Sequence, residues 1–163
     1  MVPAPAASAR GTRLLKADDI ERVIAIDRTH SGRERRRFFE KRFAAAKARP
    51  EDFIQIGMHN GGPLLGFAIA RILRGEFGRD DAIAVLDAVG VEPASRERGV
   101  GQALVHELIE ILKPMGVRSL QSQADWTNHQ LVHFFDGCGF TLAPRLALER
   151  PVAEPLDETS EQV

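Results

Sequence analysis

The feature that most constrains this fold is an apolar strand followed by a glycine-containing loop and a helix. Residues 83–91, Ile-Ala-Val-Leu-Asp-Ala-Val-Gly-Val, form a run typical of a buried central strand. From Gly99 to Lys113, apolar residues recur at helical spacing. Arginines and glycines lie between the two, where a helix start normally carries Ser, Thr, Asp or Asn. Backbone N–H groups at such a helix start are open to a ligand, so the pattern predicts an anion site there.

The remaining patterns predict a mixed α/β domain with the order β-α-α-β-β-β-α-β-α-β. A capping-box spacing from Ser31 to Glu34 predicts that the second helix opens there and runs to about Ala48, where Pro50 stops it. Turn residues at 60–62 predict a hairpin between two strands. Further strands are expected at 12–16, 53–56, 64–73, 117–124 and 140–148, and further helices after a cap at Asp18 or Asp19 and after a cap at Thr127 or Asn128.

Length and composition indicate one domain in a reducing compartment. The chain has 163 residues, a formal net charge of −1 and one cysteine, Cys138. A charge this close to neutral gives no reason to expect nucleic acid or membrane as a partner, and a single cysteine cannot form an internal disulfide. We therefore expect a cytoplasmic protein with a disordered leader at 1–11, a folded domain at 12–150 and an acidic tail at 151–163.

Three kinds of phosphate-binding loop compete for the segment before the helix. A nucleoside triphosphate loop needs G-x-x-x-x-G-K-[ST], and the absence of its Lys and Ser/Thr excludes it. A dinucleotide fingerprint needs G-x-G-x-x-G directly after the strand. Here Leu104 stands in place of the third glycine, and residues 91–98 separate Gly99 from Gly90. A nucleotide-dependent oxidoreductase with Asp125 as the ribose partner is a weak alternative that stays open on this pattern alone.

Two motifs carry the third option. The string Val91-x-Pro93-x-x-Arg96-x-x-Gly99-x-Gly101-x-x-Leu104 resembles the acyl-CoA motif of the GNAT N-acetyltransferase superfamily, [RQ]-x-x-G-x-[GA]. Residues 128–140, Asn-His-Gln-Leu-Val-His-Phe-Phe-Asp-Gly-Cys-Gly-Phe, resemble that family's N-x-x-A-x-x-[FL]-Y-x-x-x-G-F. The resemblance covers 83–140 by motif and 12–150 by element order. It implies a central, mostly antiparallel sheet flanked by helices.

The resemblance also implies acetyl-CoA as the co-substrate. The strand before the loop is expected to separate from its neighbour, which leaves the backbone of Val89 and Val91 free for the pantetheine arm, with Gly90 as a β-bulge. The loop is expected to hold the CoA pyrophosphate through its N–H groups, and Asn128 to contact the pantetheine or the amine. The implied CoA-binding residues are Val89, Gly90, Val91, Arg96, Glu97, Arg98, Gly99, Val100, Gly101, Gln102, Asn128 and Phe135.

The implied reaction is the attack of a neutral amine on a thioester. It requires a deprotonated amine, a polarised carbonyl oxygen and a thiolate that can leave. A backbone N–H near Val91 is expected to polarise the carbonyl. The family motif's tyrosine, often proposed as the acid that protonates the thiolate, falls on Phe135, and the chain contains no tyrosine. Because a thiol has a pKa of about 8.5, the thiolate can leave without a proton donor; Cys138 or water is an alternative acid.

The expected function is acetyl transfer from acetyl-CoA to the primary amine of a small molecule or protein. Direct attack in a ternary complex is expected, because no nucleophile is placed to carry the acyl group. Cys138 is the only candidate for that role. A homodimer is compatible with the resemblance. The alternative is a non-catalytic CoA-binding regulatory module, which the Phe135 replacement motivates.

Candidate general bases are Asp87 and Asp125, with Glu92 more typical of a solvated loop. A carboxylate such as Asp87 in an apolar strand is costly unless it has a partner or a catalytic task. A salt bridge is the structural alternative for Asp87, and an Asx turn before the last helix is the alternative for Asp125.

Two other features are weighed against simpler explanations. His129 and His133 lie one helical turn apart, but Gln130 stands where a zinc-protease motif needs Glu, so no metal site is expected. Basic residues crowd 33–42 and could recognise an acidic acceptor, although a solvated helix face is the simpler explanation.

Overall fold

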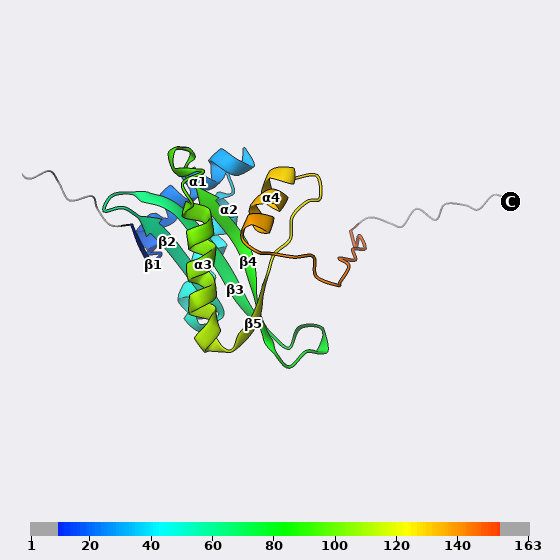
Figure 1. The fold of residues 1–163 in the computed structure, drawn as a ribbon. Coiled ribbons are helices and arrows are strands. Elements are labelled where there is room, and N and C mark those ends of the chain that lie inside the picture. The colour runs from blue at the N-terminus through cyan, green and yellow to red at the C-terminus, as the bar shows by residue number, and fades with distance from the viewer. Residues whose placement is uncertain (1–9, 154–163) are drawn as a thin grey trace, which may run out of the picture.

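The structure, a computed structural model, describes residues 10–153 and contains a five-stranded sheet with the strand order β1-β2-β3-β4-β5 (Figure 1). Neighbouring strands are antiparallel except β4 and β5, which are parallel. The strands are β1 (Gly11–Leu14), β2 (Phe53–His59), β3 (Leu64–Arg74), β4 (Ala82–Val91) and β5 (Val117–Gln121). The helices are α1 (Ile20–Ser31), α2 (Arg36–Ala48), α3 (Val100–Leu112) and α4 (His129–Gly137), with short 3-10 turns at Ala17–Asp19, Pro50–Asp52, Glu76–Gly78, Pro93–Ser95 and Lys113–Met115. The predicted fold class, a mixed α/β domain with a mostly antiparallel sheet, is confirmed.

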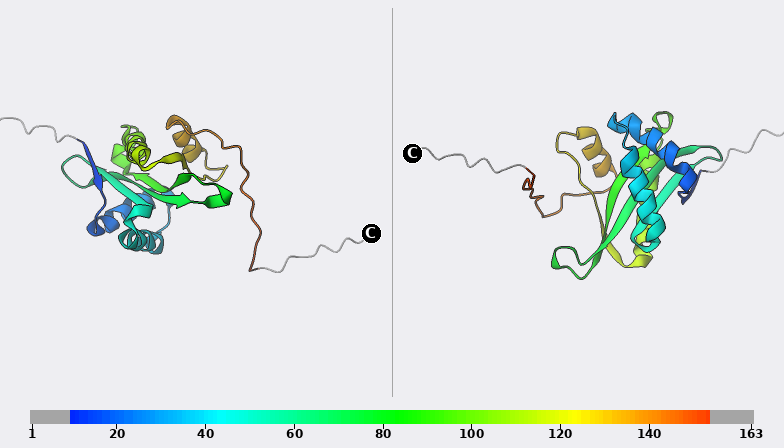
Figure 2. Two further views of the ribbon diagram at one scale, coloured as in Figure 1. Left: turned by 90° about the horizontal axis from the view of Figure 1, so that it is seen from below. Right: turned by 180° about the vertical axis from the view of Figure 1, so that it is seen from behind.

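The helices cover both faces of the sheet. Figure 2 shows α1 and α2 together on one face and α3 on the other. Two buried clusters fill the spaces between these layers. On the α3 face the cluster includes Ile56, Ala68, Leu86, Leu104 and Leu108, and on the α1–α2 face it includes Val23, Ile26, Phe39, Phe67 and Ile69. Alternate residues of β3 therefore serve opposite faces, as the period of a strand requires.

The predicted second helix begins later than its sequence pattern indicates. Ser31 is the last residue of α1, and Gly32 ends that helix in the left-handed conformation with φ 65°. α2 then starts at Arg36, so the capping-box interpretation of Ser31 and Glu34 was wrong. The Ser31 hydroxyl instead contacts the backbone of Arg33 and the carboxylate of Asp27. Glycine at the end of a helix is a strong stop signal, and here it overrides the cap pattern.

The predicted last strand at 140–148 does not form. Over these residues the chain is irregular, and Leu142, Leu146 and Leu148 are highly exposed. The preceding strand is also shorter than predicted, since β5 ends at Gln121. Within residues 10–153, β5 is therefore an edge strand of the sheet.

The ends of the chain were predicted to be a leader and a tail. β1 begins at Gly11, one residue before the predicted start of the domain. Residues 1–9 and 154–163, which hold most of the predicted leader and tail, lie outside the described residues. None of the helices described has the length and apolar character of a membrane span.

Candidate active site

The site begins where β4 and β5 separate. Their pairing runs from Ala82 opposite Val117 to Val85 opposite Gln121 and then stops. Beyond it, the Ser122 hydroxyl donates to the Leu86 carbonyl at 3.0 Å, and the strands diverge. The second half of β4 thus keeps β3 as its partner on one edge and has an open edge on the other.

A β-bulge lies at the start of this open half. Ile69 of β3 faces Ala88, but its neighbour Ala70 faces Leu86, which leaves Asp87 as the extra residue. Gly90, the expected bulge, is instead regularly paired with Phe67. A side chain at Gly90 would come within 2.7 Å of the Phe67 ring, so close packing explains this glycine. The extra residue also changes which face of the sheet the following side chains occupy.

The backbone of Val89 and Val91 faces the open edge. The Glu92 N–H donates to the Leu65 carbonyl at 2.8 Å, and bonded and non-bonded pairs alternate along an antiparallel ladder. Gly90 therefore bonds to β3, whereas the N–H and C=O groups of Val89 and Val91 point toward the space that β5 has left. A strand edge of this kind can pair with an extended ligand that contains amides.

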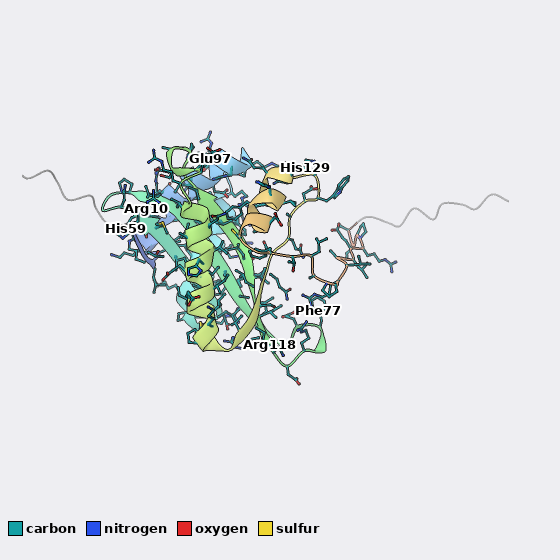
Figure 3. The ribbon with its side chains drawn as sticks, in the orientation of Figure 1. Arg10, His59, Phe77, Glu97, Arg118 and His129 are labelled. Atoms are coloured by element: carbon teal, nitrogen blue, oxygen red, sulfur yellow. The ribbon has the colours of Figure 1, made fainter. Side chains whose placement is uncertain are left out.

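The loop after β4 presents unpaired N–H groups at the start of α3. Glu97 and Gly99 have φ values of 64° and 74°, which fold the loop tightly. The first helical hydrogen bond runs from the Ala103 N–H to the Gly99 carbonyl, so the N–H groups of residues 99–102 have no acceptor within the helix. Turns of this kind and the positive end of the helix dipole both favour an anion. Figure 3 places Glu97 beside the start of α3, at the same end of the molecule as His129.

Gly101 is required by packing as well as by the loop. A Cβ at this position would lie 2.8 Å from the Phe134 ring of α4 and 3.4 Å from Val91. The glycine thus lets the first turn of α3 approach both β4 and α4. Gln102 adds a link, because its side-chain amide donates to the Gly137 carbonyl at 3.3 Å.

These elements enclose a cleft of about 770 Å³. Its walls are the open half of β4, the loop, the first turn of α3, α4 and the end of α1. Of the predicted site residues, those that line it are Asp87, Val89, Gly90, Val91, Arg96, Glu97, Gly99, Val100, Gly101, Gln102, Asn128 and Phe135. Arg98 and Asp125 do not line it. Arg98 is exposed on the loop, where its carbonyl accepts a hydrogen bond from Arg10.

Asp87 lies in the cleft wall but is held by two arginines. Its carboxylate is 2.9 Å from Nε of Arg42 on α2 and 2.7 Å from Nε of Arg71 on β3. The Asp87 side chain is 7% exposed, so the two guanidinium groups compensate a carboxylate that is almost buried. The structural alternative, a salt bridge, is what the structure contains at this position.

Asp125 and Asn128 organise the approach to α4. The Asp125 carboxylate accepts from the Thr127 N–H at 3.1 Å and from its hydroxyl at 2.8 Å, and these bonds lower the pKa of Asp125. The Asn128 side-chain oxygen accepts from the Leu131 N–H at 3.1 Å, which makes Asn128 the predicted cap of α4. Asp125 therefore forms the Asx turn, outside the cleft.

Sequence reasoning missed the polar groups that α1 and α2 contribute. His30 Nε2 lies 2.7 Å from the Val91 carbonyl oxygen and 3.1 Å from the Val91 nitrogen. Partial burial of the ring and the nearby Arg96 guanidinium lower the pKa of His30, against the opposing effects of the Val91 carbonyl and Asp27. The buried Asp27 accepts two hydrogen bonds from Arg35, at 2.9 and 2.5 Å. The helical spacing of α1 marked its apolar face, but nothing in that pattern indicated its cleft-facing end.

Phe135 stands where the family motif has tyrosine, and Cys138 follows three residues later. The Phe135 ring packs against Phe140 with centroids 4.9 Å apart, and it lines the cleft without a polar group. Burial raises the pKa of the Cys138 thiol, and Cys138 is not among the residues that line this cleft. Within residues 10–153, no group of three His, Cys, Asp or Glu side chains is placed to hold a metal ion.

The fold and the site define a class of protein. Residues 14–140 match the model of the acetyltransferase (GNAT) family. The chain belongs to this family, the GNAT acetyltransferases. The resemblance of the two sequence motifs to this family is thereby confirmed.

Several known proteins are similar to this chain. The chain is 27% identical over 104 residues to the ribosomal protein bS18 alanine N-acetyltransferase of Escherichia coli strain K12. That match covers 64% of this chain and 64% of the relative, so the chain spans somewhat less than two thirds of its length. Among solved structures, a transcriptional regulator from Bacillus halodurans C-125 superposes with a TM-score of 0.74 at 20% identity, covering 88% of this chain and 100% of the other. The aminoglycoside N-acetyltransferase AAC(6')-Iy, solved in complex with CoA, has a TM-score of 0.73 at 20% identity, covering 91% and 98%. At these identities the two structures show the shared fold.

Proposed function

We propose that this protein transfers the acetyl group of acetyl-CoA to a primary amine by direct attack in a ternary complex. One observation carries the proposal: the open edge of β4 and the unpaired N–H groups of the loop line the same cleft. The pantetheine arm has amides that suit the strand edge, and the CoA diphosphate suits the loop. The CoA complex of AAC(6')-Iy, which shares this fold, supports the same ligand here.

The backbone and the water in the cleft supply the chemistry in this proposal. The cleft-facing N–H of Val89 polarises the thioester carbonyl, because it points into the cleft beside the bulge and donates to no neighbouring strand. The carboxylates of Asp27 and Asp87 are both occupied by arginines, so the proton of the attacking ammonium leaves through water. Phe135 offers no proton, and the thiolate leaves unprotonated or takes a proton from water.

Direct attack is favoured over a covalent acetyl-enzyme intermediate. Cys138 is the one cysteine of the chain, and its raised pKa keeps it as the weakly nucleophilic thiol. It also lies outside the set of residues that line the cleft. The acceptor amine therefore reaches the thioester itself. The relatives act on an alanine of a ribosomal protein and on aminoglycosides, which supports a primary amine as the acceptor class.

The test is thiol release from acetyl-CoA in the presence of a panel of amines, amino acids, polyamines and peptides. Acceptor-dependent thiol release by the wild type and by Cys138→Ser is the expected result. Acetylated Cys138 after incubation with acetyl-CoA alone would contradict direct attack. CoA binding without turnover on any acceptor would favour the alternative, a non-catalytic CoA-binding module, which the cleft-lining Phe135 motivates. A melting temperature raised by NAD and not by CoA would overturn both.

Replacing Asp87 by asparagine should lower stability while leaving the shape of the pH–rate profile unchanged. The substitution deprives Arg42 and Arg71 of their shared counter-ion, and a charged hydrogen bond such as the one from Arg71 to Asp87 is worth about 1.5–3 kcal/mol. Urea unfolding and the pH dependence of kcat/KM measure the two effects. Asp52→Asn is the matched control, since Asp52 also contacts two arginines but is more exposed, and should cost less than about 1 kcal/mol. If the acid limb of the profile disappears in Asp87→Asn, Asp87 is the general base.

A further inference from the structure

The cleft-facing backbone groups of Val91 are already occupied. His30 extends from the last turn of α1, and its Nε2 lies within hydrogen-bond distance of both the N–H and the C=O of Val91. One ring nitrogen can serve one of these groups at a time: with the proton on Nε2 it donates to the carbonyl, and with the proton on Nδ1 it accepts from the N–H. His30 therefore lies where a ligand would have to sit to bond either backbone group of Val91 on the open edge of β4.

A second contact ties the same part of α1 to the loop. Arg96 donates from Nη2 to the Thr29 hydroxyl at 2.8 Å, and its Nε lies 3.4 Å from the Val91 carbonyl. Arg96 is the first residue of the loop motif, so the α1 end contacts both the strand and the loop. One residue further on, Ser31 contacts the Asp27 carboxylate that Arg35 also holds. The end of α1 thus links the CoA-facing side of the cleft to the side formed by α1 and α2.

These contacts conflict with a pantetheine arm at the same place. An extended ligand amide on the edge of β4 needs the N–H and C=O of Val91 for itself. His30 and the ligand cannot both hold them. The Val89 position has no comparable side chain among the hydrogen bonds of residues 10–153, so the conflict is confined to Val91. His30 is only partly buried at the end of α1, which leaves its ring room to move aside.

We propose that His30 is a positioning residue that holds the place of the pantetheine amide on Val91 and is displaced when CoA binds. This inference rests on the proposed function. Before binding, His30 keeps Val91 on the open edge of β4 paired and ties the end of α1 to that strand. On binding, the ligand amide takes over the Val91 groups and the end of α1 is released from β4. In the proposed function the acceptor amine binds on this side of the cleft, which α1 and α2 form. CoA binding thereby changes the position of the end of α1 in this wall of the cleft.

The first test is the affinity for CoA measured by calorimetry. His30→Ala should bind CoA about three- to tenfold more tightly than the wild type, because the ligand no longer displaces a hydrogen bond worth about 0.5–1.5 kcal/mol. His30→Gln keeps a donor and an acceptor and should stay close to the wild type. His106→Ala is the matched control, an exposed histidine of α3 that does not line the cleft, and should leave the affinity unchanged.

The second test follows the ring itself in the wild-type protein. The ¹⁵N shift of His30 Nε2 and the amide signal of Val91 should both change when CoA is added, since the contact between them breaks. If CoA binds with unchanged affinity in His30→Ala and the ring signal stays where it was, this inference is overturned while the proposed function stands. If the wild type binds no CoA, both are overturned.

Discussion

Replacing Gly99 by aspartate is expected to weaken CoA binding at least about a hundredfold. The substitution places a negative charge at the start of α3, where the negatively charged diphosphate is proposed to bind. Gly99 caps the helix in the left-handed conformation, and a Cβ there would meet no atom within 4 Å. The new carboxylate therefore fits but faces the position of the diphosphate. Like charges about 5 Å apart near a protein surface repel by about 3 kcal/mol, and each 1.4 kcal/mol corresponds to about tenfold in affinity.

Gly75→Asp is the matched control for this effect. Gly75 has φ 78° against 74° for Gly99, and its Cβ would also lie in open space, but it sits in the turn between β3 and β4. Both variants should lose a similar, small amount of stability, because aspartate is among the residues that tolerate this conformation. CoA affinity measured by calorimetry should fall in Gly99→Asp alone, and Gly99→Asn should lose less. Equal affinities in the two aspartate variants would contradict a diphosphate at the loop.

Replacing Phe67 by alanine should destabilise the protein by about 3–5 kcal/mol, a large share of the roughly 5–15 kcal/mol that holds a domain together. Phe67 is 0% exposed and meets Phe39 of α2 edge to face, with ring centroids 5.7 Å apart. Its ring also fills the space left by Gly90 behind the open half of β4. The substitution therefore leaves a cavity between the sheet and the helices α1 and α2.

Urea unfolding gives the free energy for this comparison. Phe77→Ala is the control, since Phe77 is 94% exposed at the turn between β3 and β4 (Figure 3), and its loss should change stability by no more than about 0.5 kcal/mol. Both substitutions remove the same ring, so the difference between them isolates burial. A Phe67→Ala protein as stable as Phe77→Ala would contradict the packing of this layer.

The sequence predicted the loop because its signal is local. Glycines before a helical pattern indicate backbone N–H groups that side chains leave accessible. The structure places almost all of the loop residues in one cleft. The cap at Asn128 and the hairpin around residue 60 are local in the same sense and are confirmed. Such features need no knowledge of distant residues.

The bulge and the α1 wall depend on contacts between distant segments. In the run at 83–91 nearly every residue is apolar, so no alternation marks Asp87 as the residue without a β3 partner. The two arginines that neutralise it come from α2 and β3, and sequence spacing could not reveal them. His30 reaches Val91 across 61 positions of the chain. These placements follow from how α1 packs across β4.

Two patterns indicated structure that does not form. The Ser31 cap pattern was outweighed by Gly32, which ends α1 first. The apolar residues at 140–148 predicted a strand. Such a pattern forms a strand only when a neighbouring strand can pair with it and its apolar face can be buried. Here Leu142, Leu146 and Leu148 have no such face within residues 10–153.

A crystal structure with coenzyme A bound tests the central claim most directly. The diphosphate should lie at hydrogen-bond distance, about 2.7–3.2 Å, from backbone nitrogens within residues 97–102, with the pantetheine along the open edge of β4. A coenzyme A molecule seated elsewhere on the protein, with the N–H groups of the loop directed at water, would contradict it.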